Sequence, residues 1–241
     1  ALTQYTGSFS EGVAALGEIL GTHGSILPVT TDRATLVAEL SDGSRLFGES
    51  AIDLPSTGDR KRIERTYLVP HHSDRVRVYP PVLEAILEAD SIVVGPGDLY
   101  TSIIPNFLVP GVTRAVARSR APLVYVLNLM TKYGETDGFH AEDFLREAER
   151  HVGREFDVVV ANSGAPPARV MELYRHQRSE LVTFRDRDAS ARRHIVEADL
   201  LEPGASIIRH DSGKLTELLC GMLFGRSKAH SDAAGDVCLE K

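Results

Sequence analysis

Residues 91–111 read SIVVGPGDLYTSIIPNFLVPG, and this stretch decides the fold. Its first residues, Ser91–Val94, have the composition of a short buried strand, and Gly95-Pro96-Gly97 breaks the chain directly after them. A strand that ends in Gly-x-Gly at the carboxyl edge of an α/β sheet is where such folds bind phosphates. Glycine lets the backbone approach a ligand, and the amides that follow can face an anion. A tight turn without a ligand gives the same pattern, so this stretch alone leaves both interpretations open.

Two further apolar segments also end in polar loops that contain glycine. Leu123–Leu127 runs into a loop that starts at Asn128, and Phe156–Val160 runs into the loop 161–167. Right-handed crossovers between parallel strands place such loops at one edge of the sheet, so we expect the three loops to share one binding crevice. Strands and helical segments alternate over this region, which predicts a parallel α/β sheet.

Outside the three strands the pattern predicts further elements. We expect helices at 3–22, 80–89, 102–118, 141–151, 167–178 and 215–224, strands at 26–29, 62–68, 195–198 and 207–209, and a hairpin of 35–40 with 45–49. Ser8 or Ser10 can cap a break in the first helix near Gly7.

Four long segments resemble the YvcK/CofD family. They are GPGDLYTSIIPNFLVPG at 95–111, NLMTKYGETDGF at 128–139, ANSGAPP at 161–167 and IIRHD at 207–211. The resemblance is closer to the YvcK-type proteins, the gluconeogenesis factors, than to the 2-phospho-L-lactate transferases. It implies a Rossmann-like three-layer α/β/α fold with a mostly parallel sheet and a small β-hairpin insertion.

The resemblance also has implications for the domain organisation. Family members carry, ahead of the matching region, a glycine-rich first strand-turn-helix, an Asp-Asp-Gly-Gly-Ser-type loop and a Gly-Asp-Ile-Arg-type loop, and this sequence contains none of them. We therefore expect residues 1–225 to be the C-terminal two-thirds of a single CofD-like α/β domain. Residues 226–241 are polar, and we expect a disordered tail there.

The composition restricts the function classes. The 241 residues carry a formal net charge of −7, which argues against a nucleic-acid binder, because such a protein needs a basic face. No apolar run approaches the ~18 residues that span a membrane, so no membrane insertion is expected. Cys220 and Cys238 fit no metal or disulfide framework, and a reducing cytoplasm is the simplest location.

Eleven residues are expected to bind a ligand. They are Gly95, Gly97, Asp98, Tyr100, Thr101, Asn128, Thr131, Asp137, Asn162, Tyr174 and Arg209. The two glycines and the amides after them are phosphate candidates, and Asn128 can read a base or sugar edge or simply form a turn. Asp98 can bind Mg²⁺, contact a ribose or cap a helix, and Asp137 can bind a metal or a sugar hydroxyl or cap a helix.

Tyr174 and Arg209 enter this set through the resemblance, which implies that they line a nucleotide-sugar site. A tyrosine can stack on a uracil ring, and an arginine can pair with a diphosphate. Without the resemblance, a half-buried helix tyrosine and a solvated arginine are the simpler interpretations. Lys132-Tyr133 stands where the family usually has Gln-Pro, so Lys132 either contacts a phosphate or lies in solvent.

The resemblance implies a cytoplasmic regulator that binds a UDP-sugar such as UDP-N-acetylglucosamine and links carbon metabolism to cell-wall precursor supply and cell shape. A regulated metabolic enzyme and a second copy of the chain are compatible partners. The alternative is a CofD-type transferase that moves a phospholactyl-type group from a nucleotide-activated donor to a deazaflavin with Mg²⁺. No nucleophile with its base stands out, which favours binding, although phosphoryl-type transfer needs mainly positioning and charge.

Overall fold

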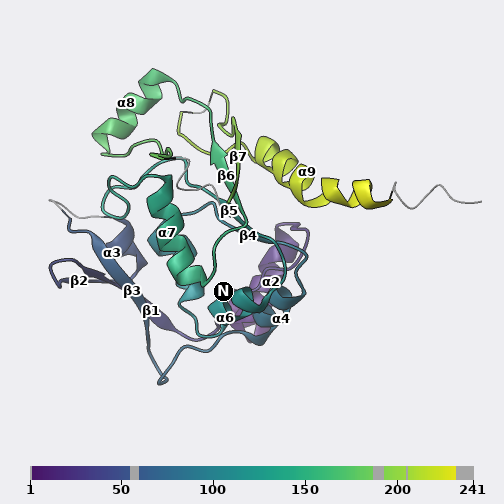
Figure 1. Cartoon of the computed structure of the whole chain (residues 1–241). Helices are drawn as coiled ribbons and strands as arrows, with labels where there is room; N and C mark the ends of the chain where they lie inside the picture. Colours follow the sequence, from purple (N-terminus) through teal and green to yellow (C-terminus); the bar gives the residue numbers. More distant parts are fainter. Residues whose placement is uncertain (1, 55–59, 187–192, 205, 232–241) are drawn as a thin grey trace, which may run out of the picture.

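The computed structural model describes residues 2–54, 60–186, 193–204 and 206–231. Four strands form a parallel sheet in sequential order (Figure 1). They are β4 (Ile92–Val94), β5 (Leu123–Val126), β6 (Val158–Asn162) and β7 (His194–Ala198). The predicted parallel sheet is therefore confirmed, with strand ends shifted by one or two residues.

Different helices cover the two faces of the parallel sheet. Leu123 and Tyr125 of β5 belong to the core cluster that contains α7 (Ala141–Val152), whereas Val124 and Val126 pack against α9 (Ser212–Ser231) on the other side. Successive side chains of a strand point to opposite faces, so a strand that is apolar throughout needs a cover on both sides. The expected three-layer α/β/α arrangement is confirmed.

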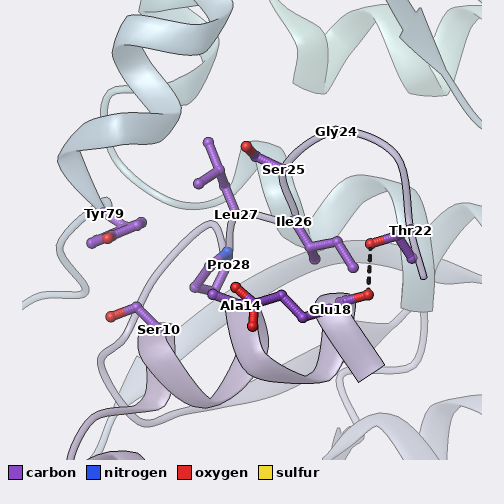
Figure 2. Close-up of a pocket in the computed structure, with 11 residues that line it drawn as sticks. Ser10, Ala14, Glu18, Thr22, Gly24, Ser25, Ile26, Leu27, Pro28 and Tyr79 are labelled. Carbon is purple, nitrogen blue, oxygen red and sulfur yellow. Dashed lines mark hydrogen bonds between the residues drawn. The ribbon is translucent and has the colours of Figure 1, made fainter. Parts of the chain in front are cut away.

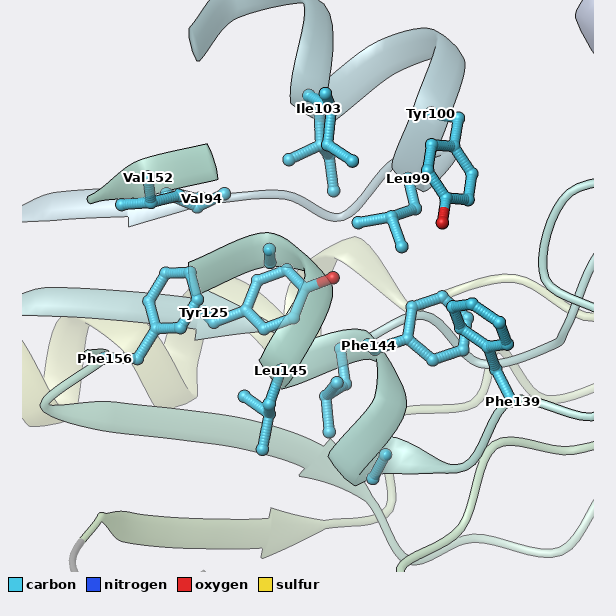
Figure 3. Packing of buried hydrophobic residues seen from close by; sticks show 14 of the residues in the cluster. Val94, Leu99, Tyr100, Ile103, Tyr125, Phe139, Phe144, Leu145, Val152 and Phe156 are labelled. Atoms are coloured by element: carbon cyan, nitrogen blue, oxygen red, sulfur yellow. The ribbon is translucent and has the colours of Figure 1, made fainter. Parts of the chain in front are cut away.

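Aromatic side chains fill the core between the sheet and α7 (Figure 3). Tyr125 and Phe156 stack with their ring centroids 4.7 Å apart, and Phe139 meets Phe144 edge-on at 5.6 Å. Such aromatic pairs contribute roughly 0.5–1.5 kcal/mol beyond the apolar area that they bury. Because Phe139 ends the loop that follows β5, this packing also holds that loop against the core.

A second, antiparallel sheet has the order β2-β1-β3. Its strands are β1 (Ala34–Leu40), β2 (Arg45–Phe47) and β3 (Ile63–Pro70). β1 and β2 are the expected hairpin, and Gly43 in its turn has a φ of +82°, which favours glycine. The expected hairpin is thus two strands of a three-stranded sheet. The predicted strand 45–49 ends at Phe47, and α3 (Glu49–Asp53) follows it.

Two predicted helices are broken by glycine. The segment 3–22 forms α1 (Leu2–Thr6) and α2 (Phe9–Ile19), separated at Gly7, and Ser8 caps α2 by accepting from the amide of Glu11. The segment 102–118 forms a π-helical turn η1 (Leu99–Ile103), α5 (Ile104–Phe107) and α6 (Val112–Arg118). The break before α6 follows from Pro110, which lacks an amide hydrogen, and Gly111, whose φ is +105°.

Two other expectations about elements are wrong. Residues 26–29 form no strand, and one backbone hydrogen bond joins Val29 to Tyr79. Residues 207–209 form no strand either, and the only β-pairing near them among the described residues is an isolated bridge between Leu201 and His210. α9 is longer than the expected helix 215–224 at both ends, and the disordered tail at 226–241 stays a prediction. Residues 232–241 lie outside the described part of the chain. The helices α4 (Pro80–Glu88) and α8 (Ala168–His176) agree with their predictions within two residues.

Within the described ranges, no helix combines the length and the apolar character that crossing a bilayer requires.

Candidate functional site

The parallel strands bring their polar loops to one edge of the sheet. Because β4, β5 and β6 pair in parallel, the loops 95–102, 128–138 and 162–166 all leave the sheet at its carboxyl edge. The first two loops are joined directly, since the Asn128 side-chain amide donates to the Gly97 carbonyl oxygen at 2.8 Å. The three loops thus meet at one edge of the sheet as expected, and a binding crevice shared by all three stays a prediction.

The turn after β4 needs glycine because it runs tightly against β5. Gly95 has a φ of +79°, and a Cβ there would lie 2.9 Å from the Val126 carbonyl oxygen. A Cβ on Gly97 would lie 3.2 Å from the Cβ of Ser102, which is also a close contact. Amides in the first turn of a helix have no acceptor within that helix. The amides at the start of η1 therefore remain the predicted phosphate-facing groups.

A cavity of about 340 Å³ opens between the second and third loops. Its polar lining includes Asn128, Asn162, Ser163, Gly164, Thr183 and Glu197. This volume lies at the lower end of the range that small-molecule sites occupy. The cavity therefore has room for one part of a nucleotide-sized ligand, beside the turn that follows β4.

Several buried polar atoms at this edge have no hydrogen-bond partner among the described residues. They include Thr101 Oγ1, Asn128 Oδ1 and His210 Nε2. His210 also bonds to the backbone of Leu127 at the end of β5, and burial lowers the pKa of its imidazole. Buried polar atoms without a partner are rare in folded proteins and often mark a site for water or a ligand. The sequence singled out the segment that contains His210 but assigned the site role to Arg209.

Two predicted residues use their side chains to hold the backbone. Asn162 Oδ1 accepts from the amides of Gly164 and Leu200, each at 3.0 Å, and so fixes the turn after β6. Thr131 Oγ1 accepts from the amide of Glu180 at 2.8 Å. Both residues therefore shape the loops around the cavity.

Three other predicted residues make contacts of a structural kind. Tyr100 is 1% exposed and packs in the core, where burial raises the pKa of its phenol (Figure 3). The hydroxyl oxygen of Tyr174 accepts from the amide of Ile208 at 2.9 Å and so ties α8 to the segment after β7. Arg209 forms a forked ion pair with Glu202, and its side chain is 58% exposed.

Lys132 lies at the centre of three carboxylates that the fold brings together. Its ammonium bonds to Asp53 at the end of α3 and to Asp98 Oδ2 at 2.6 Å, and it lies 3.2 Å from Glu135 Oε1. The three carboxylate oxygens lie within 4.8 Å of one another. The side chain of Lys132 is thus held against acidic groups from α3, from the start of η1 and from its own loop. The sequence predicted instead that Lys132 contacts a phosphate or lies in solvent.

The pKa values of this cluster reflect burial and charge together. Burial opposes the charge of Lys132, but the bonds with Asp53 and Asp98 outweigh this effect and raise the pKa of the ammonium. Glu135 is the most enclosed member, with a side chain that is 1% exposed, and burial raises its pKa to about 7 although Lys132 acts in the opposite direction. The negative charges of Asp98 and Asp53 act in the same direction as burial and make a smaller contribution to this rise in the pKa of Glu135.

The acidic groups do not fit a metal ion while Lys132 stays in place. Carboxylate oxygens are the ligands that Mg²⁺ prefers, and Asp98 was one of the two metal candidates. The Lys132 ammonium, however, already contacts all three carboxylates, so a divalent cation cannot take the same position. Asp137, the other candidate, is exposed and accepts a bond from the Gly134 amide.

A second pocket, of about 280 Å³, lies between α2 and residues 22–28 (Figure 2). Thr22 closes one end of it by donating to the Gly17 carbonyl at 3.1 Å. Its lining residues Ser10, Glu18 and Tyr79 come from segments that carry none of the sequence motifs above. None of the eleven predicted ligand-binding residues lines this pocket.

Fold and site together define an α/β protein of the kind that binds ligands at the carboxyl ends of parallel strands. The family model described as 2-phospho-L-lactate transferase CofD matches residues 1–201, and the chain belongs to this family. A Thermotoga maritima relative with the provisional name of gluconeogenesis factor is 40% identical over 227 residues, or 91% of this chain and 68% of the relative. The gluconeogenesis factor of Bacillus subtilis is 34% identical over 225 residues, or 92% of this chain and 69% of that protein.

Solved structures give the same result for the fold. A crystal structure of a Bacillus halodurans protein superposes with a TM-score of 0.81 at 32% identity, covering 90% of this chain and 68% of that one. The chain spans between 47% and 69% of the length of several curated relatives, among them a Nostoc protein at 47%.

Proposed function

We propose that this chain forms the ligand-binding part of a cytoplasmic regulator that binds a UDP-sugar, such as UDP-N-acetylglucosamine, and connects carbon metabolism with cell-wall precursor supply and cell shape. Relatives that carry the name gluconeogenesis factor support a role in carbon metabolism. The sheet-edge site supports a nucleotide ligand, because strand-end loops with glycine are where parallel α/β sheets bind phosphates.

The proposal rests on Asn128, whose side chain joins two of the strand-end loops. Its amide group bonds to Gly97 in the turn after β4, while its other side-chain atom, Oδ1, is buried without a partner among the described residues. One face of Asn128 thus positions the turn, and the other is free to accept a bond from a base or a sugar. The adjacent cavity of about 340 Å³ gives that ligand room.

Isothermal titration calorimetry of the full-length protein with UDP-sugars and with guanine nucleotides tests this proposal. We expect a UDP-sugar to bind, and we expect Asn128→Asp to weaken binding by about tenfold or more, because the change removes the donor to Gly97 and adds a negative charge. Asn106→Asp is the matched control, since Asn106 is an exposed asparagine that bonds to the carbonyls of Ser102 and Ile103. Equal affinities for the two variants, or no binding of any UDP-sugar, would contradict the proposal.

Tyr174 and Arg209 are proposed to support the same ligand from the segment after β7. We expect Tyr174→Ala to weaken UDP-sugar binding, because the change frees the Ile208 amide and loosens the segment that carries His210. We expect Arg209→Ala to weaken binding as well, because the arginine would leave Glu202 and pair with the diphosphate of the ligand. Arg175→Ala on α8 is the control, since Arg175 also pairs with a nearby glutamate, Glu172. Unchanged affinity in both test variants would remove these residues from the site.

A transferase remains the second candidate, because the matching family model carries a transferase description. The two functions differ in the fate of the nucleotide-linked compound, since a regulator returns it intact and a transferase consumes it. Incubation with a nucleotide-activated donor, a deazaflavin acceptor and Mg²⁺ separates them. We expect no consumption of the donor, and turnover that Asp98→Asn abolishes would establish the transferase instead.

A further inference from the structure

Asp53, Asp98 and Glu135 are arranged as the ligands of a cation. They come from α3, from the start of η1 and from the loop after β5, and one oxygen of each lies within 4.8 Å of the others. Glu135 is enclosed, with a side chain that is 1% exposed and with Lys132 Nζ 3.2 Å from its Oε1. Its other oxygen, Oε2, is buried without a hydrogen-bond partner among the described residues. Buried carboxylates in this state need a cation, and the fold provides one in Lys132.

We propose that these three carboxylates form a cation site that this chain fills with its own Lys132 ammonium, and that the site binds a divalent cation of the Mg²⁺ or Mn²⁺ class once the ammonium is removed. The geometry supports an exchange of one cation for the other. Lys132 Nζ contacts all three carboxylates, at 2.6 Å for Asp98, 3.2 Å for Glu135 and directly for Asp53. A hard divalent cation prefers the same carboxylate oxygens.

Among the described residues, Arg60 also lies near the cluster, but it does not replace Lys132. Arg60 donates to the backbone carbonyls of Ala51 and Ile52, where it covers the end of α3. Its charge is felt by Glu135 and Asp137, but its hydrogen bonds go to the backbone. Lys132 is therefore the group whose removal leaves the three carboxylates without a direct partner.

The Lys132 ammonium also affects how the sheet edge can bind an anion. Asp98 stands directly after Gly97, at the start of η1, so its negative charge would repel a phosphate at that turn. An ammonium fixed by the chain reduces this repulsion at every magnesium concentration, whereas a bound metal does so only when it is present. The unmodified chain is thus adapted to hold an anion beside Asp98 without a divalent cation.

Binding of Mn²⁺, followed by loss of the free-ion signal in electron paramagnetic resonance, tests the inference without any nucleotide, so its outcome is independent of the proposed function. We expect Lys132→Gln to bind one Mn²⁺ at least about tenfold more tightly than the unmodified chain. Adding Glu135→Gln to that variant should abolish the gain. Lys132→Arg keeps the positive charge and should bind as weakly as the unmodified chain.

Lys214→Gln is the matched control, because Lys214 pairs with the single carboxylate of Asp199 and with the Leu201 carbonyl. Loss of that lysine should create no Mn²⁺ site. Failure of folded Lys132→Gln to bind Mn²⁺ would overturn the inference. If this variant is destabilised, its melting temperature should rise with MnCl₂ but not with NaCl of equal ionic strength. An equal response to both salts would also overturn the inference. In the unmodified chain, Mn²⁺ binding that Glu135→Gln removes would overturn it independently of how the lysine variants fold.

Discussion

At the scale of single residues, Glu135 shows burial and charge in direct competition. Burial raises the pKa of its carboxyl from 4.5 to about 7, although the nearby Lys132 ammonium stabilises the ionised form. The folded chain therefore holds a proton on Glu135 between these values, where the unfolded chain has already released it. The stability from this group is fully present below pH 4.5 and is lost as the pH rises through about 7.

We therefore expect Glu135→Gln to flatten the decline of stability with rising pH. Relative to this variant, the free energy of unfolding of the unmodified chain should fall by roughly 1–3 kcal/mol between pH 4.5 and pH 8. Urea unfolding at several pH values measures the difference. Glu172→Gln is the control, because Glu172 lies on the exposed side of α8 with a side chain that is 56% exposed. A pH profile for Glu135→Gln that matches those of the control and the unmodified chain would show that Glu135 does not titrate in this range.

At the scale of elements, local pattern predicted most of the parallel sheet and missed features that only tertiary contacts create. The apolar runs at β4, β5 and β6 and their glycine-bearing ends were visible, so the meeting of the loops at one edge could be predicted. The sequence could not predict which side chains enter the site. Tyr100 faces the core, and Asn162 accepts a hydrogen bond from a backbone amide. Lys132 bonds to Asp53, which lies 79 residues away in the sequence, and no local sequence pattern predicts such a pair.

The contact between α6 and α7 gives a prediction at the same scale. Gly153 ends α7 with a φ of +89°, and a Cβ there would clash with the methyl group of Thr113. The hydroxyl of Thr113 donates to the carbonyls of Phe107 and His151, which holds this side chain in place. We expect Gly153→Ala to cost about 1–3 kcal/mol more in unfolding free energy than Gly138→Ala. Gly138 has a φ of +66° but open space around it, so this control carries the backbone strain alone. Equal costs in thermal denaturation would show that the helices adjust without loss.

At the scale of the whole molecule, the two sheets have different relations to the proposed ligand. The parallel sheet supplies the loops 95–102, 128–138 and 162–166 at its carboxyl edge, whereas the hairpin of β1 and β2 supplies none of the predicted ligand-binding residues. The phosphate oxygens of a bound nucleotide should accept hydrogen bonds from the amides at the start of η1. Such binding should restrict the motion of all three loops.

Hydrogen–deuterium exchange with and without UDP-N-acetylglucosamine measures this response of the whole chain. We expect slower exchange in the three loops and in the segment around His210, and unchanged exchange in the hairpin from Ala34 to Phe47. The loops should respond together, because Asn128 ties the first to the second and the cavity joins the second to the third. Protection confined to the pocket beside α2, or spread evenly over both sheets, would mean that the ligand does not bind at the carboxyl edge. Protection of one loop without the others would mean that the loops meet at this edge without forming a single site.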